Sequence, residues 1–327
     1  MTVANPMKKL VDRLASTGFS AAFINDLMPV WWDKSLEKSE QSMLLLKMHF
    51  SKNLGLDLAS LLDNRRSVKF QLAENVHYKL TKNKKEDQVV LSQSLARSMA
   101  KLVASAAVRG YKPLPKNAGL IRQKILKDHP WTGFDNLVDY CWSRGIPVIY
   151  LSRLPKGAKK FEGMVVDVDG RPVIVLAKKS SDPSWQLFVL AHEIGHIGCG
   201  HVKEGAGYLD EVVDSDDDNP KEKEATAYGL KLLTGSSRTP IGPKSGGLTG
   251  RQLAKASKDY GRKHQVEPGH IALNYAHNQN FIAVGNAALK TIGGHYDAVE
   301  YVRDALKQNI DETEIPKDSR YVLSRLV

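Results

Sequence analysis

Apolar positions recur along the first part of the chain with the spacing of α-helices. Between residues 7 and 62, and again over 89–108 and 118–127, apolar side chains return every three or four positions. This spacing places them on one face of a helix, where they can pack against neighbouring elements. A charged run at residues 82–87 interrupts the pattern. We therefore predict several helices before residue 130, with a solvated loop at the charged run.

The pattern changes after residue 130, where runs typical of strands appear. A helix is predicted over 134–144, followed by a buried strand over 146–151. Two β-rich runs, 163–168 and 172–177, are then joined by an Asp-Gly dipeptide, which is strongly favoured in two-residue hairpin turns. Helix, strand and hairpin in this order predict an α+β fold.

These patterns divide the chain into three segments. Prolines before residue 130 stop helices, so we place a domain boundary there. Residues 1–130 are expected to form a helical domain, residues 131–280 a domain with the small sheet, and residues 281–327 a C-terminal extension. Residues 50–62 join two helices through a glycine turn, which is a weak indication of a helix-turn-helix.

The net charge of +11 lies entirely within the first 130 residues. Apolar residues make up 42% and charged residues 25% of the chain, which excludes an intrinsically disordered protein. A basic segment beside a neutral one favours binding of nucleic acid or of an acidic partner, because phosphate contacts come chiefly from Lys and Arg. A basic surface that contacts only solvent is the alternative.

The sequence also predicts a cytoplasmic location. Its two cysteines, Cys141 and Cys199, are far apart, so a disulfide framework is not expected. The first ten residues hold two lysines but no apolar run after them, unlike a secretory signal peptide. No stretch of about 18 apolar residues is present, and hence no membrane span is predicted.

The run His-Glu-Ile-Gly-His at residues 192–196 carries the strongest indication of chemistry. An Asp-Pro pair upstream favours the start of a helix. Histidines four positions apart lie on one face of such a helix, so His192 and His196 can bind one tetrahedral ion. Glu193 points to one side, where it can take a proton from a water at the metal. The alternative is a chance match, with two histidines on a helix flank beside a solvated glutamate.

A third ligand is expected on the next helix. Residues 221–233, entered through an Asn-Pro pair, have a strong helical pattern that presents Glu222 and Glu224. Three protein ligands leave one position open for water, which is the arrangement of catalytic zinc sites. The residues alone leave both glutamates as candidates.

The two helices together resemble the ImmA/IrrE family of metallo-endopeptidases, in which a His-Glu-x-x-His helix precedes a helix of the form Glu-Ala-Asn-x-Phe-Ala. Residues 224–229 read Glu-Ala-Thr-Ala-Tyr-Gly, so Thr, Tyr and Gly replace the family's Asn, Phe and Ala. Glu224 then matches the position of the family's third zinc ligand, with Glu222 as the second candidate. The resemblance covers roughly residues 130–280.

The resemblance implies a zincin-like catalytic domain that holds one zinc ion per chain through His192, His196 and Glu224; manganese is also compatible. It implies that Glu193 is the general base of peptide-bond hydrolysis. Members of the family typically cut a helix-turn-helix repressor or an antitoxin-like regulator in a stress response. The expected substrate is therefore a specific cytoplasmic regulatory protein.

Two other functions are open from the sequence. One is a DNA-binding or partner-binding regulator, of transcription or of a toxin and antitoxin pair, with a structural or vestigial metal site. The basic first segment favours this function, whereas the intact Glu193 argues against it. The other is a zinc hydrolase that acts on a small molecule.

Further residues are secondary candidates. His201 is expected beside the ligands or at the surface, and Cys199 is expected to be a buried structural thiol rather than a ligand of a soft metal. The acidic run 214–218 is expected to be a solvated loop. An extended substrate is expected to pair with an edge of the sheet over 163–177. The candidates for stabilising the oxyanion are Tyr208, Tyr228, His270 and His277.

Overall fold

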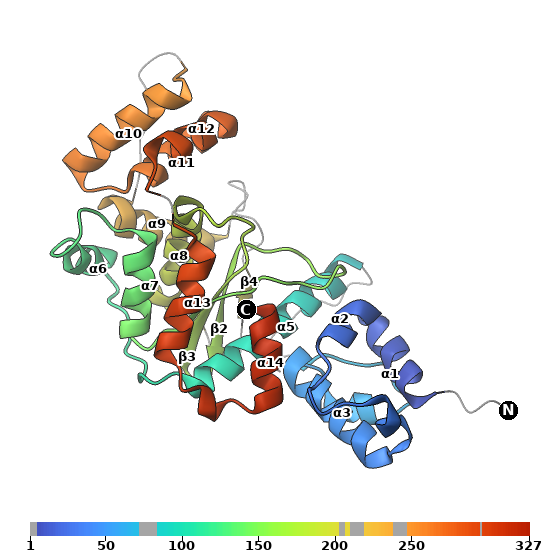
Figure 1. The fold of residues 1–327 in the computed structure, drawn as a ribbon. Coiled ribbons are helices and arrows are strands. Elements are labelled where there is room, and N and C mark those ends of the chain that lie inside the picture. Colours follow the sequence, from blue (N-terminus) through green and yellow to red (C-terminus); the bar gives the residue numbers. More distant parts are fainter. Residues whose placement is uncertain (1–4, 72–83, 203–206, 210–218, 238–246, 295) are drawn as a thin grey trace.

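The N-terminal part is helical, as the apolar spacing predicts, and Figure 1 shows it to one side of a central sheet. The computed structural model describes residues 5–71, 84–202, 207–209, 219–237, 247–294 and 296–327. The first helices are α1 (Pro6–Ala15), α2 (Ala21–Asp26), the 3-10 helix η1 (Lys34–Lys38), α3 (Glu40–Leu54) and α4 (Leu58–Leu62).

The turn between α3 and α4 is the one predicted from the glycine at its centre. Gly55 has a φ of 67°, a left-handed conformation that glycine adopts without strain. Asp57 then caps α4, because its carboxylate accepts from the backbone N–H of Ser60 at 2.7 Å. Two helices joined by a glycine turn are thus present, but α4 spans only five residues.

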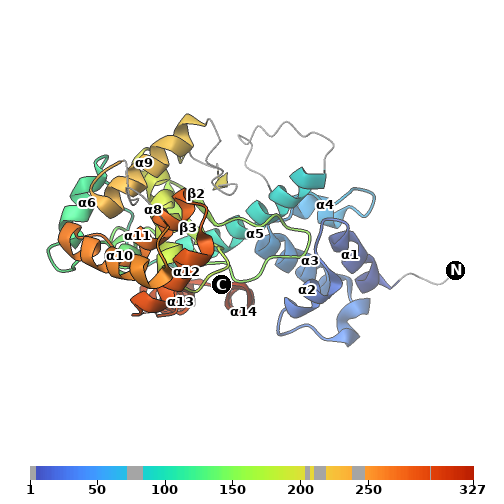
Figure 2. The same ribbon diagram turned by 90° about the horizontal axis from the view of Figure 1, so that it is seen from above.

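A long helix links these N-terminal helices to the sheet. α5 (Lys84–Ala106) packs against α3 and against two strands, β2 (Gly163–Val168) and β3 (Arg171–Leu176). Figure 2 shows it running between the two parts of the chain. The loop predicted over the charged run is wrong from Lys84 onward, because lysine and glutamate are good helix formers and the run continues into the helix.

In the described residues, four strands form one sheet in the order β1-β3-β2-β4. β1 (Val148–Tyr150) runs parallel to β3, whereas β2 is antiparallel to both β3 and β4 (Gly207–Leu209). Asp169 and Gly170 turn the β2–β3 hairpin with φ values of 51° and 81°. Positive φ at both positions is typical of the predicted two-residue turn, which is confirmed.

The next four helices along the chain are α6 (Ala118–Ile125), α7 (Phe134–Ser143), α8 (Pro183–Gly198) and α9 (Pro220–Thr234). α8 packs on β2 and β3 and against α7, and α9 packs along α8. The buried apolar side chains of α7, α8 and the first three strands belong to one hydrophobic core. A small sheet with helices packed on it confirms the predicted α+β class.

The C-terminal helices form two groups. They are α10 (Gly250–His264), α11 (Pro268–Asn278), α12 (Ile282–Ile292), α13 (Ala298–Asn309), the 3-10 helix η2 (Glu312–Glu314) and α14 (Lys317–Leu326). α10, α11 and α12 pack on one another around a small core that contains Leu253 and Tyr275. α13 covers β1 and α7, and α14 packs against α3 and α5 (Figure 1).

The end of the chain therefore returns to the sheet. The backbone N–H of Ser152, just after β1, donates to the carbonyl of Leu326 at 2.7 Å. The division into residues 1–130, 131–280 and 281–327 stays a prediction. Among the described helices, none is long and apolar enough to cross a membrane.

Candidate metal centre

α8 begins where the sequence predicts and buries the motif against the sheet. The side chain of Asp182 accepts from the backbone N–H of Ser184 at 2.9 Å, and a proline occupies the first turn. His192, Glu193 and His196 are 2%, 1% and 0% exposed. Three buried polar side chains on one short stretch are costly unless they have polar partners or a ligand, so the chance-match interpretation is disfavoured.

Small residues bring α9 into backbone contact with α8. A Cβ added to Gly195 would lie 2.3 Å from the carbonyl oxygen of Ala225, which is closer than any real contact. A Cβ on Gly229 would lie 3.0 Å from the carbonyl oxygen of Ala191. The glycine that replaces the family's alanine at position 229 therefore lies at a tight helix contact. This contact sets which face of α9 meets the two histidines.

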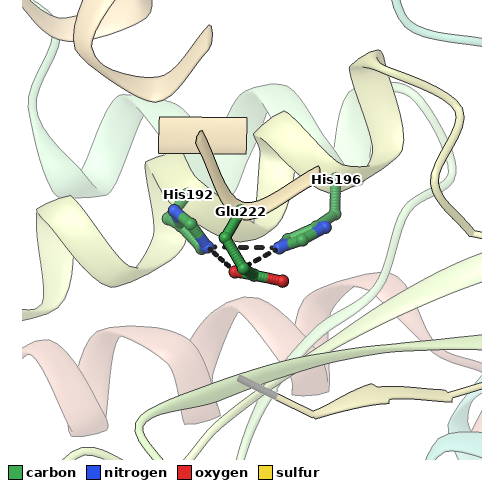
Figure 3. A group of neighbouring side chains, drawn as sticks. All are labelled: His192, His196 and Glu222. Atoms are coloured by element: carbon green, nitrogen blue, oxygen red, sulfur yellow. Dashed lines mark hydrogen bonds and ion pairs between the residues drawn. The ribbon is translucent and has the colours of Figure 1, made fainter. Parts of the chain in front are cut away.

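His192, His196 and Glu222 meet at one point between the helices (Figure 3). The Nε2 atoms of the two histidines are 3.1 Å apart, and the Glu222 Oε2 atom lies 3.2 Å from His192 Nε2 and 3.4 Å from His196 Nε2. Ligand atoms at about 2.0 to 2.1 Å from a tetrahedral zinc ion are about 3.3 Å apart. The three donor atoms thus have the spacing and the chemistry of one face of a metal-ligand tetrahedron.

The carboxylate of Glu224 does not lie near the two Nε2 atoms, although the family motif indicates Glu224 as the third ligand. Residues two positions apart on a helix point about 200° apart, so Glu222 and Glu224 face different surroundings. The Glu224 Oε2 atom instead lies 2.9 Å from Nε2 of His201. Of the two glutamates that the sequence leaves open, the geometry favours Glu222 as the third ligand.

Each histidine of the motif also has a polar partner at its other ring nitrogen. Nδ1 of His192 lies 3.1 Å from the hydroxyl oxygen of Thr226, and Nδ1 of His196 lies 3.1 Å from Nδ1 of His201. Such partners fix the ring orientation and the tautomer of metal-binding histidines. Sequence reasoning missed the role of Thr226. Its position four residues after Glu222, on the same helix face, was the available signal.

The carboxylate of Glu193 lies against the sheet. A Cβ added to Gly163, the first residue of β2, would lie 2.2 Å from Glu193 Oε1 and 2.8 Å from a methyl group of Val189. The carboxylate therefore occupies the space that a side chain at position 163 would take. Its place to one side of the histidine pair is the one expected for a base that is not a ligand.

The candidates for stabilising the oxyanion are scattered. The hydroxyl of Tyr228 donates to the carbonyl of Pro115 at 2.6 Å. The ring of His270 stacks on Phe188 at 6.1 Å, and Phe188 in turn lies 6.3 Å from the ring of His192. Burial lowers the pKa of His270 to about 4, so this ring is neutral at physiological pH. His277 is exposed.

Two of the secondary predictions fall outside what the structure describes, namely the side chain of Tyr208 and the acidic run 214–218. A third is wrong: Cys199 is exposed rather than buried. Cys199 follows the last residue of α8, and the chain reverses directly after it at Gly200, which has a φ of 74°.

A comparison with known families gives a match over the residues that carry the site. Residues 141–234 match the family model described as the IrrE N-terminal-like domain, of peptidase family M78. No curated protein and no solved structure matches the chain significantly. The matched residues run from α7 to the end of α9 and include His192, His196 and Glu222. Residues 141–234 are therefore a metallopeptidase domain of the ImmA/IrrE family, whose members hydrolyse peptide bonds.

Proposed function

We propose that this chain is a zinc-dependent endopeptidase that cleaves a specific cytoplasmic regulatory protein. The observation that carries the proposal is the triangle of donor atoms formed by His192, His196 and Glu222, with edges of 3.1 to 3.4 Å. Two imidazoles and one carboxylate are the ligand set of many catalytic zinc sites and leave a fourth position open. We propose one zinc ion per chain at this triangle, with manganese as the alternative ion.

When bound, such an ion acidifies a water molecule and polarises the carbonyl of the scissile peptide bond. Glu193 is proposed to accept a proton from the attacking water and to pass it to the leaving amine. Gly163 leaves a gap for this carboxylate beside β2, and Val189 packs next to that gap. The hydroxyl of Thr226, 3.1 Å from Nδ1 of His192, holds the ring of that histidine.

The substrate is proposed to bind as an extended segment along the sheet. Among the described strands, β2 next to Glu193 pairs with β4, and β4 pairs only with β2. β4 therefore offers the edge at this side of the sheet, where a substrate strand can pair through backbone hydrogen bonds. A repressor or an antitoxin-like regulator is the substrate class that the family resemblance suggests.

A cleavage assay with a matched variant tests this proposal. Glu193→Gln keeps the size of the side chain but removes the base, so cleavage should fall by about 100-fold to 10,000-fold while metal content stays at one ion per chain. The substrates are casein and a helix-turn-helix protein encoded beside this chain, and the cleavage position is read by mass spectrometry. A single cut in the regulator, lost in the variant, supports the proposal.

Two results would contradict it. Broad degradation of casein with the regulator left whole would exclude a specific regulatory substrate. Equal cleavage by wild type and Glu193→Gln would exclude the proposed base. The alternative function, a regulator that binds DNA or a partner and has only a structural metal, is favoured by the basic first segment. It predicts no cleavage of either protein and a binding affinity for nucleic acid that falls steeply with salt.

A further inference from the structure

His196 is connected to a second buried histidine that the proposed chemistry does not use. Its Nδ1 atom lies 3.1 Å from Nδ1 of His201, and Nε2 of His201 lies 2.9 Å from the carboxylate of Glu224. His201 is 5% exposed, whereas the side chain of Glu224 is 65% exposed. A continuous path of polar contacts thus leads from the donor triangle to the surface.

The end of α8 is shaped to place His201 against His196. The backbone N–H of His201 donates to the carbonyl of His196, and that of Gly200 donates to the carbonyl of Ile197. This pair of bonds, with Gly200 in the left-handed conformation, forms a Schellman motif. The motif reverses the chain directly after the helix, and the His201 ring returns to the ring of the metal-site histidine.

We propose that His201 and Glu224 are positioning residues that hold His196 in its metal-binding tautomer, and that they thereby prevent a second ion from binding at Cys199, His201 and Glu224. The proposal rests on the proposed metal site at His192, His196 and Glu222. Donor atoms of the second cluster, Cys199, His201 and Glu224, lie within 4.8 Å of one another, so their spacing alone is compatible with an ion.

The number of protons on the rings of His196 and His201 explains why only one of the two clusters can bind an ion. A neutral imidazole carries one proton, on either Nδ1 or Nε2. If His196 directs its Nε2 lone pair to the donor triangle, its proton is on Nδ1 and donates to Nδ1 of His201. His201 then carries its own proton on Nε2 and donates it to Glu224. A nitrogen that carries a proton has no lone pair for a metal.

The opposite placement of the two ring protons would allow an ion to bind at the second cluster instead. An ion at Nε2 of His201 would require the proton of that ring on Nδ1, where it would donate to Nδ1 of His196. The proton of His196 would then lie on Nε2, inside the donor triangle. One shared hydrogen bond between the rings therefore allows an ion at either cluster but not at both. The deeper burial of His192 and His196 and their contact with Glu222 favour the triangle.

Metal titration of the full chain, freed of metal with a chelator, tests the proposal through affinity and stoichiometry. Zinc is titrated against a competing chelator, and cobalt is titrated in parallel because its visible spectrum reports the ligand geometry. His201→Phe keeps a ring of similar size but removes both nitrogens. It should weaken metal binding by about 10-fold to 100-fold, the usual effect of losing such a partner, and should alter the cobalt spectrum.

Glu224 offers a pair of variants on a side chain that is 65% exposed. Glu224→Ala should weaken metal binding in the same direction as His201→Phe, by a smaller factor. Glu224→Gln keeps an oxygen that accepts from His201 and should restore affinity close to that of wild type. Cys199→Ala is the control, because it removes a donor of the second cluster and leaves both hydrogen bonds intact. It should bind one ion with wild-type affinity.

The outcomes are distinguishable. His201→Phe and Glu224→Ala with wild-type affinity and spectrum would overturn the positioning role and leave the proposed function in place. A second equivalent of zinc bound by wild type and lost in Cys199→Ala would show that the second cluster is a metal site, and would also overturn the proposal. No metal binding by wild type would refute the proposed metal site and the positioning role together.

Discussion

The position of Glu193 depends on a glycine that lies far from it in sequence. Gly163 belongs to an extended strand and has no need of glycine for its backbone, yet a side chain there would overlap the Glu193 carboxylate. The histidines depend on Thr226 and His201 in a similar way. At the scale of single residues, the site is thus defined by the neighbours that orient its donor atoms.

Gly163→Ala is predicted to impair cleavage without removing the metal. The new methyl group would lie 2.2 Å from Glu193 Oε1, so the carboxylate must move, and a shift of about 1 Å in a catalytic group can cost about 100-fold in rate. Cleavage rate and metal content of the same preparation check this. A rate within a factor of two of wild type would contradict the prediction, because the displaced carboxylate of Glu193 would still act as the base.

His270 is predicted to make the protein sensitive to acid. Burial lowers its pKa to about 4, whereas an unfolded histidine has a pKa of about 6.5. Between these values the unfolded state binds more protons, so the free energy of unfolding falls as the pH falls from about 6.5 to 4, by up to about 3 kcal/mol from this residue.

Denaturant unfolding at pH 7 and pH 4 of wild type and of His270→Phe measures this contribution. The variant should lose less stability than wild type between the two pH values, since all other titrating groups are common to both. Equal losses in the two proteins would mean that His270 is not buried in its neutral form.

At the scale of elements, the proposed metal site lies between α8 and α9, whose backbones are in contact. Ala225 and Gly229 of α9 lie on the same helix face as Glu222, three and seven positions after it, and both are at the contact with α8. Small residues at this spacing mark the face that touches a neighbouring helix. Their positions distinguish Glu222 from Glu224 as the third ligand, but only once α8 is known to be the helix that α9 contacts.

Gly195→Ala is predicted to weaken metal binding by separating these helices. Its Cβ would lie 2.3 Å from a backbone oxygen of Ala225, which cannot move without the whole of α9. Overpacking of this kind costs about 1 to 3 kcal/mol of stability. Thermal unfolding and zinc affinity are the measurements. Gly110→Ala, where no atom lies within 4 Å of the new Cβ, should change neither.

At the scale of the whole molecule, local sequence patterns predicted many of the helices and strands. They did not predict the contacts between residues far apart in the chain. The Asp169-Gly170 turn and the start of α8 at Asp182 have clear local causes, and both are where the sequence places them. The hydrogen bond from Ser152 to Leu326 joins residues far apart in the chain. Its formation depends on packing against the sheet, which no local pattern reports.

The basic first segment is also joined to the sheet by contacts between residues far apart in the chain. Its helices are connected to the sheet through α5, and α14 packs against both α3 and α5. A regulatory substrate that pairs with β4 would thus meet a molecule whose N-terminal helices are fixed to the sheet through this packing. The charge of +11 in that segment is proposed to contribute to the choice of partner rather than to the chemistry.

Anomalous X-ray scattering at the zinc edge, from crystals of zinc-loaded protein, tests the central claim most directly. The account predicts one peak per chain between α8 and α9, about 2.0 to 2.2 Å from Nε2 of His192, from Nε2 of His196 and from a carboxylate oxygen of Glu222. A peak with Glu224 in place of Glu222, or no peak near His192 and His196, would contradict it.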